Sequence, residues 1–294
     1  MPWIQILLET TSDHVPRLES LLMEAGASAV TFQDAKNQPL YEPELGSTPL
    51  WTNTTVIGLF DAHEETSAIV SFLKAESGIA PFPKYKIDIV EDKDWEREWM
   101  THFHPIRFGS KLWVCPSWKT PPEPGAINLM LDPGLAFGTG THPTTALCLK
   151  WLDQQKDING STLVDYGCGS GILAIAACLL GAKQVVGVDI DSQALEATIN
   201  NAQRNKIVVE KLEVFLPNDF PSIQVSYVIA NILAQPLIAL ASKLAEMVET
   251  GGHLALSGIV FEQTEAVINA YSPWFKIGEA VHQEGWVLIS GQRY

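Results

Sequence analysis

The sequence has few basic residues and no long hydrophobic run. Lys and Arg number 19 against 34 Asp and Glu, which gives a formal net charge of −15. Nucleic-acid enzymes usually carry a basic stripe that neutralises phosphates, so this balance predicts no direct nucleic-acid binding. The apolar stretches are only about strand length, and residues 1–12 lack a basic start followed by an apolar run. We therefore expect neither a membrane span nor a signal peptide, and we expect a cytoplasmic monomer.

Cysteine is scarce as well, with four residues and no Cys-x-x-Cys pair. The four are Cys115, Cys148, Cys168 and Cys178. In a cytosolic protein they are expected to be buried, reduced thiols. His102 and His104 lie two positions apart with no second pair of ligands nearby, so the sequence predicts no metal site.

The length and the composition predict a folded chain of two domains, since 294 residues exceed one ordinary core and 46% of them are hydrophobic. The negative charge is concentrated near the N-terminus. Residues 1–100 hold 17 Asp and Glu against 7 Lys and Arg, a balance of −10, so the remaining residues carry −5. This charge would steer a basic partner towards the N-terminal part, or it would serve solubility alone.

The N-terminal part alternates between strand-like and helical patterns. The pattern predicts strands at residues 3–10, 29–34, 54–61 and 84–91 and helices near residues 15–22 and 69–73. The order βαββαβ is typical of the α+β ferredoxin-like unit, whose open sheet has helices on one face. We therefore expect residues 1–92 to form a ferredoxin-like substrate-recognition domain. Residues 93–106, with Trp95 and Trp99 on one face, are expected to form a helical linker.

Strands alternate with helices beyond residue 110, which is the pattern of a doubly wound parallel sheet. Five apolar strands are expected at residues 162–166, 184–189, 211–216, 225–230 and 253–259. Two closing strands follow at about 275–282 and 286–291, and the short turn between them requires antiparallel pairing. We therefore expect residues 107–294 to form an α/β, Rossmann-like domain with a seven-stranded sheet.

A glycine-rich turn, residues 167–171 (GCGSG), joins the first of these strands to the helical stretch ILAIAACLL. Glycine lets a ligand approach the backbone, and the first N–H groups of the helix are free to bind it. A tight strand-to-helix turn can also need glycine for backbone reasons alone. A dinucleotide fingerprint that begins at Gly167 would need glycine where Ile172 stands, so hydride transfer is disfavoured.

Acidic residues lie on both sides of this turn. Asp165 completes D-x-G-x-G-x-G, which resembles the first motif of Rossmann-like methyltransferases, and its charge suits a ligand with an ammonium group. Asp189 ends the next strand, where its carboxylate can accept both hydroxyls of a ribose. Asp191 competes for this role, but its place before a helical run favours a helix N-cap. Gly167, Gly169 and Asp189 are therefore the candidate cofactor-binding residues of this region.

Two further stretches complete the candidate site. Residues 131–145 (LDPGLAFGTGTHPTT) precede an apolar helix, and Thr144 and Thr145 in its first turn can hold a carboxylate. The length of this stretch favours a lid, with a simple turn as the alternative. Residues 228–236 (VIANILAQP) end the fourth strand with Asn231, where amino-group methyltransferases carry an Asn or Asp that accepts hydrogen bonds from the nucleophilic nitrogen. A cap of the strand end is the structural alternative for Asn231.

Together these stretches resemble the ribosomal protein L11 methyltransferases, a family of class I S-adenosylmethionine-dependent enzymes. The motifs LDPGLAFGTGTHPTT, VDYGCGSGILAIAA, GVDID and ANILA carry the likeness, which spans essentially the whole chain. The resemblance implies methyl transfer from S-adenosyl-L-methionine to the N-terminal α-amine and lysine ε-amines of ribosomal protein L11, a basic protein. It also implies cofactor contacts at Thr145, Gly167, Asp189 and Asn231.

Asn231 is the expected catalytic residue, because it can orient the attacking amine without a general base. Two other functions share these features. A methyltransferase that acts on a small-molecule or nucleobase amine would have the same catalytic half, because a fold does not fix its substrate. A non-catalytic sensor of S-adenosylmethionine would keep Asp189 and the glycines but would not need Asn231.

Overall fold

The computed structural model describes residues 2–38, 48–91, 103–132, 138 and 140–294. The chain divides into two compact units, Met1–Met100 and Thr101–Tyr294. Of the helical linker expected at 93–106, residues 93–102 lie outside the described residues. The described end is not helical, because residues 103–105 form neither helix nor strand and Ile106 begins a strand. No helix within the described ranges is long and apolar enough to cross a membrane.

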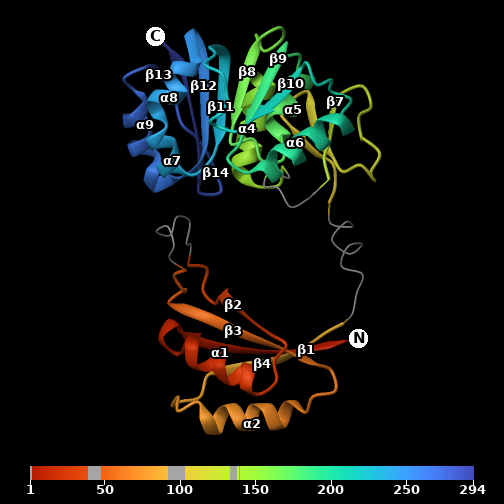
Figure 1. Ribbon diagram of the computed structural model, residues 1–294, viewed down its shortest axis with the longest axis vertical. Coiled ribbons are helices and arrows are strands. Elements are labelled where there is room, and N and C mark those ends of the chain that lie inside the picture. Colours follow the sequence, from red (N-terminus) through yellow and green to blue (C-terminus); the bar gives the residue numbers. More distant parts are fainter. Residues whose placement is uncertain (1, 39–47, 92–102, 133–137, 139) are drawn as a thin grey trace. The chain divides into compact units, whose positions relative to one another are not determined.

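The N-terminal unit has one antiparallel sheet in the order β2-β3-β1-β4. Its elements are β1 (Trp3–Thr11), a 3-10 turn (Ser12–His14), α1 (Val15–Glu24), β2 (Ala29–Asp34), β3 (Asn53–Asp61), α2 (Thr66–Glu76) and β4 (Lys84–Val90) (Figure 1). This is the βαββαβ order of a ferredoxin-like unit, so the predicted order of elements is confirmed.

The core of the N-terminal unit lies on one face of its sheet. Ile6 and Leu8 of β1 are fully buried and belong to one apolar cluster with Leu18 and Leu22 of α1. Because side chains alternate along a strand, the neighbours of these residues point to the other face. Gln5 and other residues of that face are only partly buried, and α1 and α2 pack on the opposite face.

The larger unit is built around an eight-stranded sheet in the order β10-β9-β8-β11-β12-β15-β13, with β14 also paired to β15. In chain order, the first half of this unit contains β5 (Ile106–Phe108), β6 (Leu112–Cys115), β7 (Ile127–Met130), α4 (Pro143–Gln154), β8 (Thr162–Tyr166), α5 (Ile172–Leu179), β9 (Gln184–Val188), α6 (Ser192–Arg204), β10 (Leu212–Phe215) and β11 (Val225–Asn231). The remainder are α7 (Ala234–Ala239), α8 (Ala241–Met247), β12 (Val248–Val260), a 3-10 turn (Phe261–Gln263), α9 (Thr264–Tyr271), β13 (Phe275–Ile277), β14 (Val281–Gln283) and β15 (Trp286–Arg293).

The Rossmann-like prediction is confirmed, with two differences in detail. The single strand expected at 275–282 is two short strands, because β13 pairs with the end of β15 and β14 pairs with its beginning. The sheet therefore has eight strands instead of seven. A second, three-stranded sheet in the order β5-β6-β7 was not expected. The antiparallel pairing of β15 with its neighbours agrees with the short turn before it.

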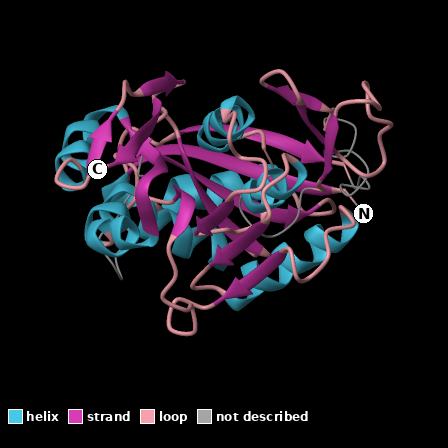
Figure 2. Cartoon of the chain, turned by 90° about the horizontal axis from the view of Figure 1, so that it is seen from above, coloured by secondary structure: helices cyan, strands magenta, loops and turns pink. Residues whose placement is uncertain are grey.

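Helices cover the central sheet on both faces (Figures 1 and 2). One apolar cluster joins Leu163 of β8 to α4 and α5, and a second joins Val164 of the same strand to α7, α8 and α9. The strands β8, β9, β10, β11 and β12 run parallel. The chain passes from β8 to β9 on one side, while β11 lies on the other side of β8. Ligands bind at such a reversal, beyond the carboxyl ends of the strands.

Candidate functional site

A cavity of about 570 Å³ lies at the carboxyl ends of β8, β9 and β11. The five residues predicted to bind the cofactor all line it: Thr145, Gly167, Gly169, Asp189 and Asn231. They come from four separate stretches of the sequence, which the parallel strands and the start of α4 bring together. Gly138, from the stretch that precedes α4, lines the same cavity.

The glycine turn is held against β9 and packed onto the segment after β11. The backbone N–H groups of Gly167 and Cys168 donate to the carbonyl of Val188 at 2.7 and 3.1 Å. Gly167 has a φ of +84°, and a Cβ atom at this position would overlap the side chain of Ile232. Glycine is therefore required here both by the backbone conformation and by the close approach of Ile232.

Asp189 is fixed by two backbone donors. Its Oδ2 accepts from the N–H of Gly169 at 2.9 Å, and its Oδ1 accepts from the N–H of Asp191 at 3.0 Å. Asp191 in turn caps α6, because its side chain accepts from the N–H of Gln193 at 2.9 Å, which confirms the predicted N-cap. A carboxylate has about four acceptor sites, so Asp189 can still accept hydroxyl groups from a ligand.

Asn231 and Thr145 meet across the cavity wall. The side-chain amide of Asn231 donates to Oγ1 of Thr145 at 3.3 Å, and Thr145 is fully buried in the first turn of α4. The Oδ1 atom of Asn231 is buried and accepts no hydrogen bond from the described residues. Because an unpaired buried acceptor is unfavourable, this oxygen is suited to an N–H group that enters the cavity.

The stretch that was predicted to form a lid lies partly outside the described residues. Asp132, Gly138 and the residues from Gly140 onward are described, whereas 133–137 and 139 are not. Thr144 occupies the first turn of α4 as expected, and its hydroxyl lies 2.7 Å from Nδ1 of His142.

Asp165 lies in β8, two residues before the glycine turn, but it does not line the cavity. Its carboxyl group is fully buried. Oδ2 accepts from the N–H of Ala174 at 3.0 Å, while Oδ1 has no partner among the described residues. Burial raises the pKa of Asp165 to about 7, although the hydrogen bond from Ala174 acts in the opposite direction. Asp165 is therefore partly protonated near neutral pH, and its hydrogen-bond partner, Ala174, lies in the first part of α5.

Tyr166 and Lys243 line the cavity, although neither stood out in the sequence. Nζ of Lys243 donates to Oη of Tyr166 at 3.4 Å and lies 5.5 Å from the centre of its ring. Tyr166 could have been found from its place inside the glycine motif, next to Gly167. Lys243 has no such signal, because only the packing of α8 against the end of β8 brings it to this wall.

The described cysteines are all buried and free, as expected for reduced thiols. Cys168 belongs to the glycine turn and lines the cavity, and burial raises the pKa of its thiol. A thiol whose pKa is raised is a poor nucleophile at neutral pH. Within the described part of the chain, no group of three or more His, Cys, Asp or Glu side chains is placed to hold a metal ion.

Comparison with known proteins identifies the family. The family model described as ribosomal protein L11 methyltransferase (PrmA) matches residues 2–294. The ribosomal protein L11 methyltransferase of Marinomonas sp. (strain MWYL1) is 55% identical over 296 residues, which cover 100% of both chains. The enzyme of the same name from Pseudomonas savastanoi pv. phaseolicola is 52% identical over 293 residues, again with 100% of both chains covered.

A solved structure agrees with this assignment. The crystal structure of a ribosomal protein L11 methylase from Lactobacillus delbrueckii subsp. bulgaricus is 30% identical in sequence and superimposes with a TM-score of 0.58. The match covers 65% of this chain and 98% of that chain. With the family model and the full-length relatives, these findings show that the chain belongs to the ribosomal protein L11 methyltransferase family.

Proposed function

We propose that this protein transfers methyl groups from S-adenosyl-L-methionine to the N-terminal α-amine and the lysine ε-amines of ribosomal protein L11. One observation carries the proposal: a single cavity collects a glycine turn, an acidic strand end and Asn231, whose buried Oδ1 has no partner among the described residues, in a chain with full-length relatives of that name. When bound, S-adenosylmethionine would supply the methyl group of a positively charged sulfonium to a neutral amine, with S-adenosylhomocysteine as the leaving group and the amine's proton released to solvent.

Five residues are proposed to hold the cofactor, and the surroundings of the first four fit its chemistry. Asp189 keeps acceptor sites for the two ribose hydroxyls while backbone N–H groups fix its orientation. Gly167 and Gly169 leave the backbone of the turn accessible to a ligand. Thr145, at the positive end of α4, suits the methionyl carboxylate.

Asn231 is proposed to bind the cofactor and to orient the attacking amine. Its buried Oδ1 can accept a hydrogen bond from the nucleophilic nitrogen, while Thr145 holds the other end of the amide. A free lysine has a pKa of about 10.4 and is protonated at neutral pH, so burial in the cavity must favour its neutral form. Positioning and removal of water then supply the catalysis, and no general base is required.

The N-terminal ferredoxin-like domain, residues 1–92, is proposed to select the protein substrate. Residues 1–100 carry a balance of −10, from 17 acidic and 7 basic side chains, which complements a basic ribosomal protein. One face of its sheet is not covered by α1 or α2 and is available for docking. We further propose that the protein is a cytoplasmic monomer without direct nucleic-acid contacts, in keeping with its net charge of −15.

The test is to incubate the protein with isotope-labelled S-adenosylmethionine and unmodified ribosomal proteins, and to locate the label by mass spectrometry. We expect label on the N-terminus and on lysines of ribosomal protein L11. Cofactor binding without transfer to any amine would indicate a sensor instead. Label on small-molecule or nucleobase amines but not on the protein would assign a different substrate class.

A further inference from the structure

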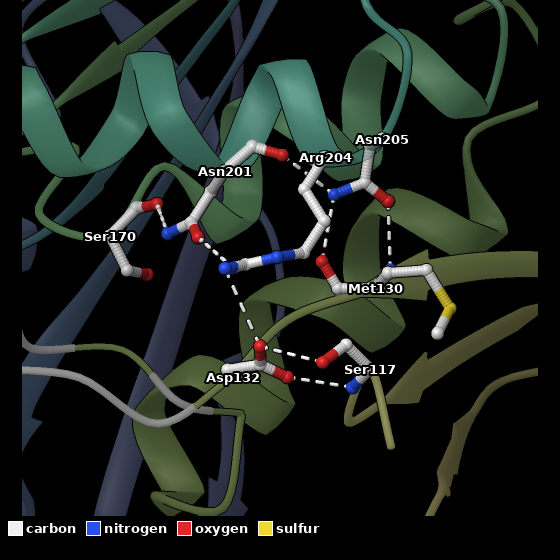
Figure 3. A network of polar contacts seen from close by, with 7 residues as sticks. All are labelled: Ser117, Met130, Asp132, Ser170, Asn201, Arg204 and Asn205. Atoms are coloured by element: carbon white, nitrogen blue, oxygen red, sulfur yellow. Dashed lines mark hydrogen bonds and ion pairs between the residues drawn. The ribbon is translucent and has the colours of Figure 1, made fainter. Parts of the chain in front are cut away.

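A chain of hydrogen bonds joins α6 to the glycine turn and to the stretch before α4 (Figure 3). The side-chain amide of Asn201 donates to the carbonyl of Ser170 at 2.8 Å. The hydroxyl of Ser170, which lies between two glycines of the turn, donates to the carbonyl of Gly138 at 2.7 Å. Gly138 and Gly169 both line the cavity. A half-buried Asn on α6 thus fixes two segments that form its wall.

Arg204, the last residue of α6, extends this chain towards Asp132. Its Nη1 donates to Oδ1 of Asn201 at 2.8 Å, and its Nη2 lies 3.4 Å from Oδ2 of Asp132. Asp132 is held in turn by Ser117, whose N–H and hydroxyl donate to the two carboxylate oxygens at 2.6 and 2.8 Å. Figure 3 shows Asp132 between Arg204 and Ser117. The amide of Asn201 therefore has its donor and its acceptor both engaged.

Two more residues on the same side of α6 act alongside Asn201. Asn205 accepts from the N–H of Met130 at 2.7 Å and donates to its carbonyl at 2.8 Å. Thr198 is fully buried, and its hydroxyl donates to the carbonyl of Gly169 at 3.1 Å. The spacing of three and four residues between Thr198, Asn201 and Asn205 places them on one helix face. This face binds the backbone of the glycine turn, at Gly169 and Ser170, and the backbone of β7, at Met130.

We propose that Asn201 is a positioning residue for the cofactor and that Arg204 acts through it. The inference rests on the proposed function, since it concerns the S-adenosylmethionine site. A backbone turn can bind a ligand tightly only when its N–H groups and carbonyls are held in place before the ligand arrives. Asn201 holds the turn at Ser170 and, through the hydroxyl of Ser170, holds Gly138 on the opposite segment.

The first test compares two neighbouring asparagines of α6 by calorimetry with S-adenosylmethionine. Asn201→Ala should weaken cofactor binding about tenfold, because it releases the turn and leaves the carbonyl of Ser170 without this donor. Asn200→Ala is the matched control, since Asn200 is exposed and makes no side-chain hydrogen bond to the described residues. It should change the dissociation constant less than twofold. Turnover at saturating cofactor should stay within about twofold of wild type in both variants.

The second test measures whether Arg204 works through Asn201. Arg204 is exposed, so Arg204→Gln should fold, and we expect cofactor binding about threefold weaker. In the double variant the combined loss of cofactor affinity should be smaller than the product of the two single losses, because both substitutions remove parts of one network. Independent, multiplicative losses would show that Arg204 does not act through Asn201 and would overturn that part of the proposal.

Direct binding also separates this inference from the proposed function. If the wild-type protein fails to bind S-adenosylmethionine, the proposed function is wrong. If wild type binds the cofactor and Asn201→Ala binds it equally well, Asn201 has only a structural role and the inference alone is overturned. If Asn201→Ala fails to fold, Arg204→Gln tests the proposal instead. Unchanged cofactor affinity in Arg204→Gln would contradict the proposal.

Discussion

The two units of the chain differ most in where they bury polar side chains. Among the described residues, the N-terminal unit buries only Thr54 and Ser77. The larger unit buries seven such side chains: Thr144, Thr145, Asp153, Asp165, Ser170, Thr198 and Ser257. Several of these lie in or beneath the cavity wall. Buried polar groups are unfavourable unless they are hydrogen-bonded, and each of the seven makes a hydrogen bond. Among the buried atoms of these seven side chains, only Oδ1 of Asp165 lacks a partner among the described residues, so the cost of burial falls mainly on Asp165.

The N-terminal unit has an almost entirely apolar core. Its core is an ordinary apolar layer on one sheet face, and its charge of −10 lies in the part of the chain with no chemical motif. The proposed division of tasks, in which the N-terminal unit recognises the substrate and the larger unit performs the chemistry, rests on this difference.

Removing the N-terminal unit is the strongest test of this division. A truncated protein that begins at Pro105 should fold, since the larger unit has its own two cores, and should bind S-adenosylmethionine within about threefold of wild type. We expect it to methylate intact ribosomal protein L11 at least about a hundredfold more slowly, because the substrate is no longer held near the site. Calorimetry and a timed methylation assay measure the two effects. A truncated protein with the full rate would assign recognition to the larger unit.

Asn231→Ala tests whether the cavity does chemistry as well as binding. We expect turnover to fall about a hundredfold while cofactor affinity falls less, because the proposed partner of Oδ1 is the amine in the transition state. Single-turnover rates at saturating cofactor provide the measurement. A rate equal to that of wild type would return Asn231 to the role of a strand cap.

The central features of the fold and the site could be predicted because they depend on local patterns. Parallel strands end at one edge, so the glycines after β8, Asp189 after β9 and Asn231 at the end of β11 had to lie near one another. The helix cap at Asp191 follows from its own side chain and is confirmed. Their roles in binding and catalysis remain predictions.

Other features depend on contacts between distant residues. The split of residues 275–282 into β13 and β14 is decided by pairing along β15, which the local sequence does not encode. The burial of Asp165 is decided by the packing of α5 over β8, and the motif alone indicates only a carboxylate near the turn. The polar face of α6 had a weak signal in the spacing of Thr198, Asn201 and Asn205. Its partners at Met130 and Ser170 could not be derived from that spacing.

The pH dependence of unfolding can measure how much the buried carboxyl group of Asp165 lowers the stability of the larger unit. Its pKa of about 7 in the folded protein exceeds the usual value of about 3.9, so the native state binds more protons between these limits. The contribution of Asp165 to the free energy of unfolding should therefore fall by roughly 1 to 4 kcal/mol as the pH rises from about 4 to about 7. Asp165→Asn keeps an acceptor for Ala174 and should remove this dependence. Thermal unfolding of both proteins across this range gives the comparison, and parallel curves would contradict the prediction.

The variant Asp189→Ala tests whether Asp189 binds the cofactor or only stabilises the glycine turn. We expect S-adenosylmethionine to bind about 1 to 3 kcal/mol more weakly, because a charged acceptor for the ribose is lost. Asp189 also accepts from Gly169, so the apo protein should be slightly less stable. Asp191→Ala is the matched control, since it removes a helix cap two residues away and should lower stability by about 0.5 to 2 kcal/mol with little change in affinity. Calorimetry and thermal unfolding together distinguish the two carboxylates. If both variants lose stability and neither loses affinity, Asp189 only supports the turn, and the ribose must be bound by another group of the cavity.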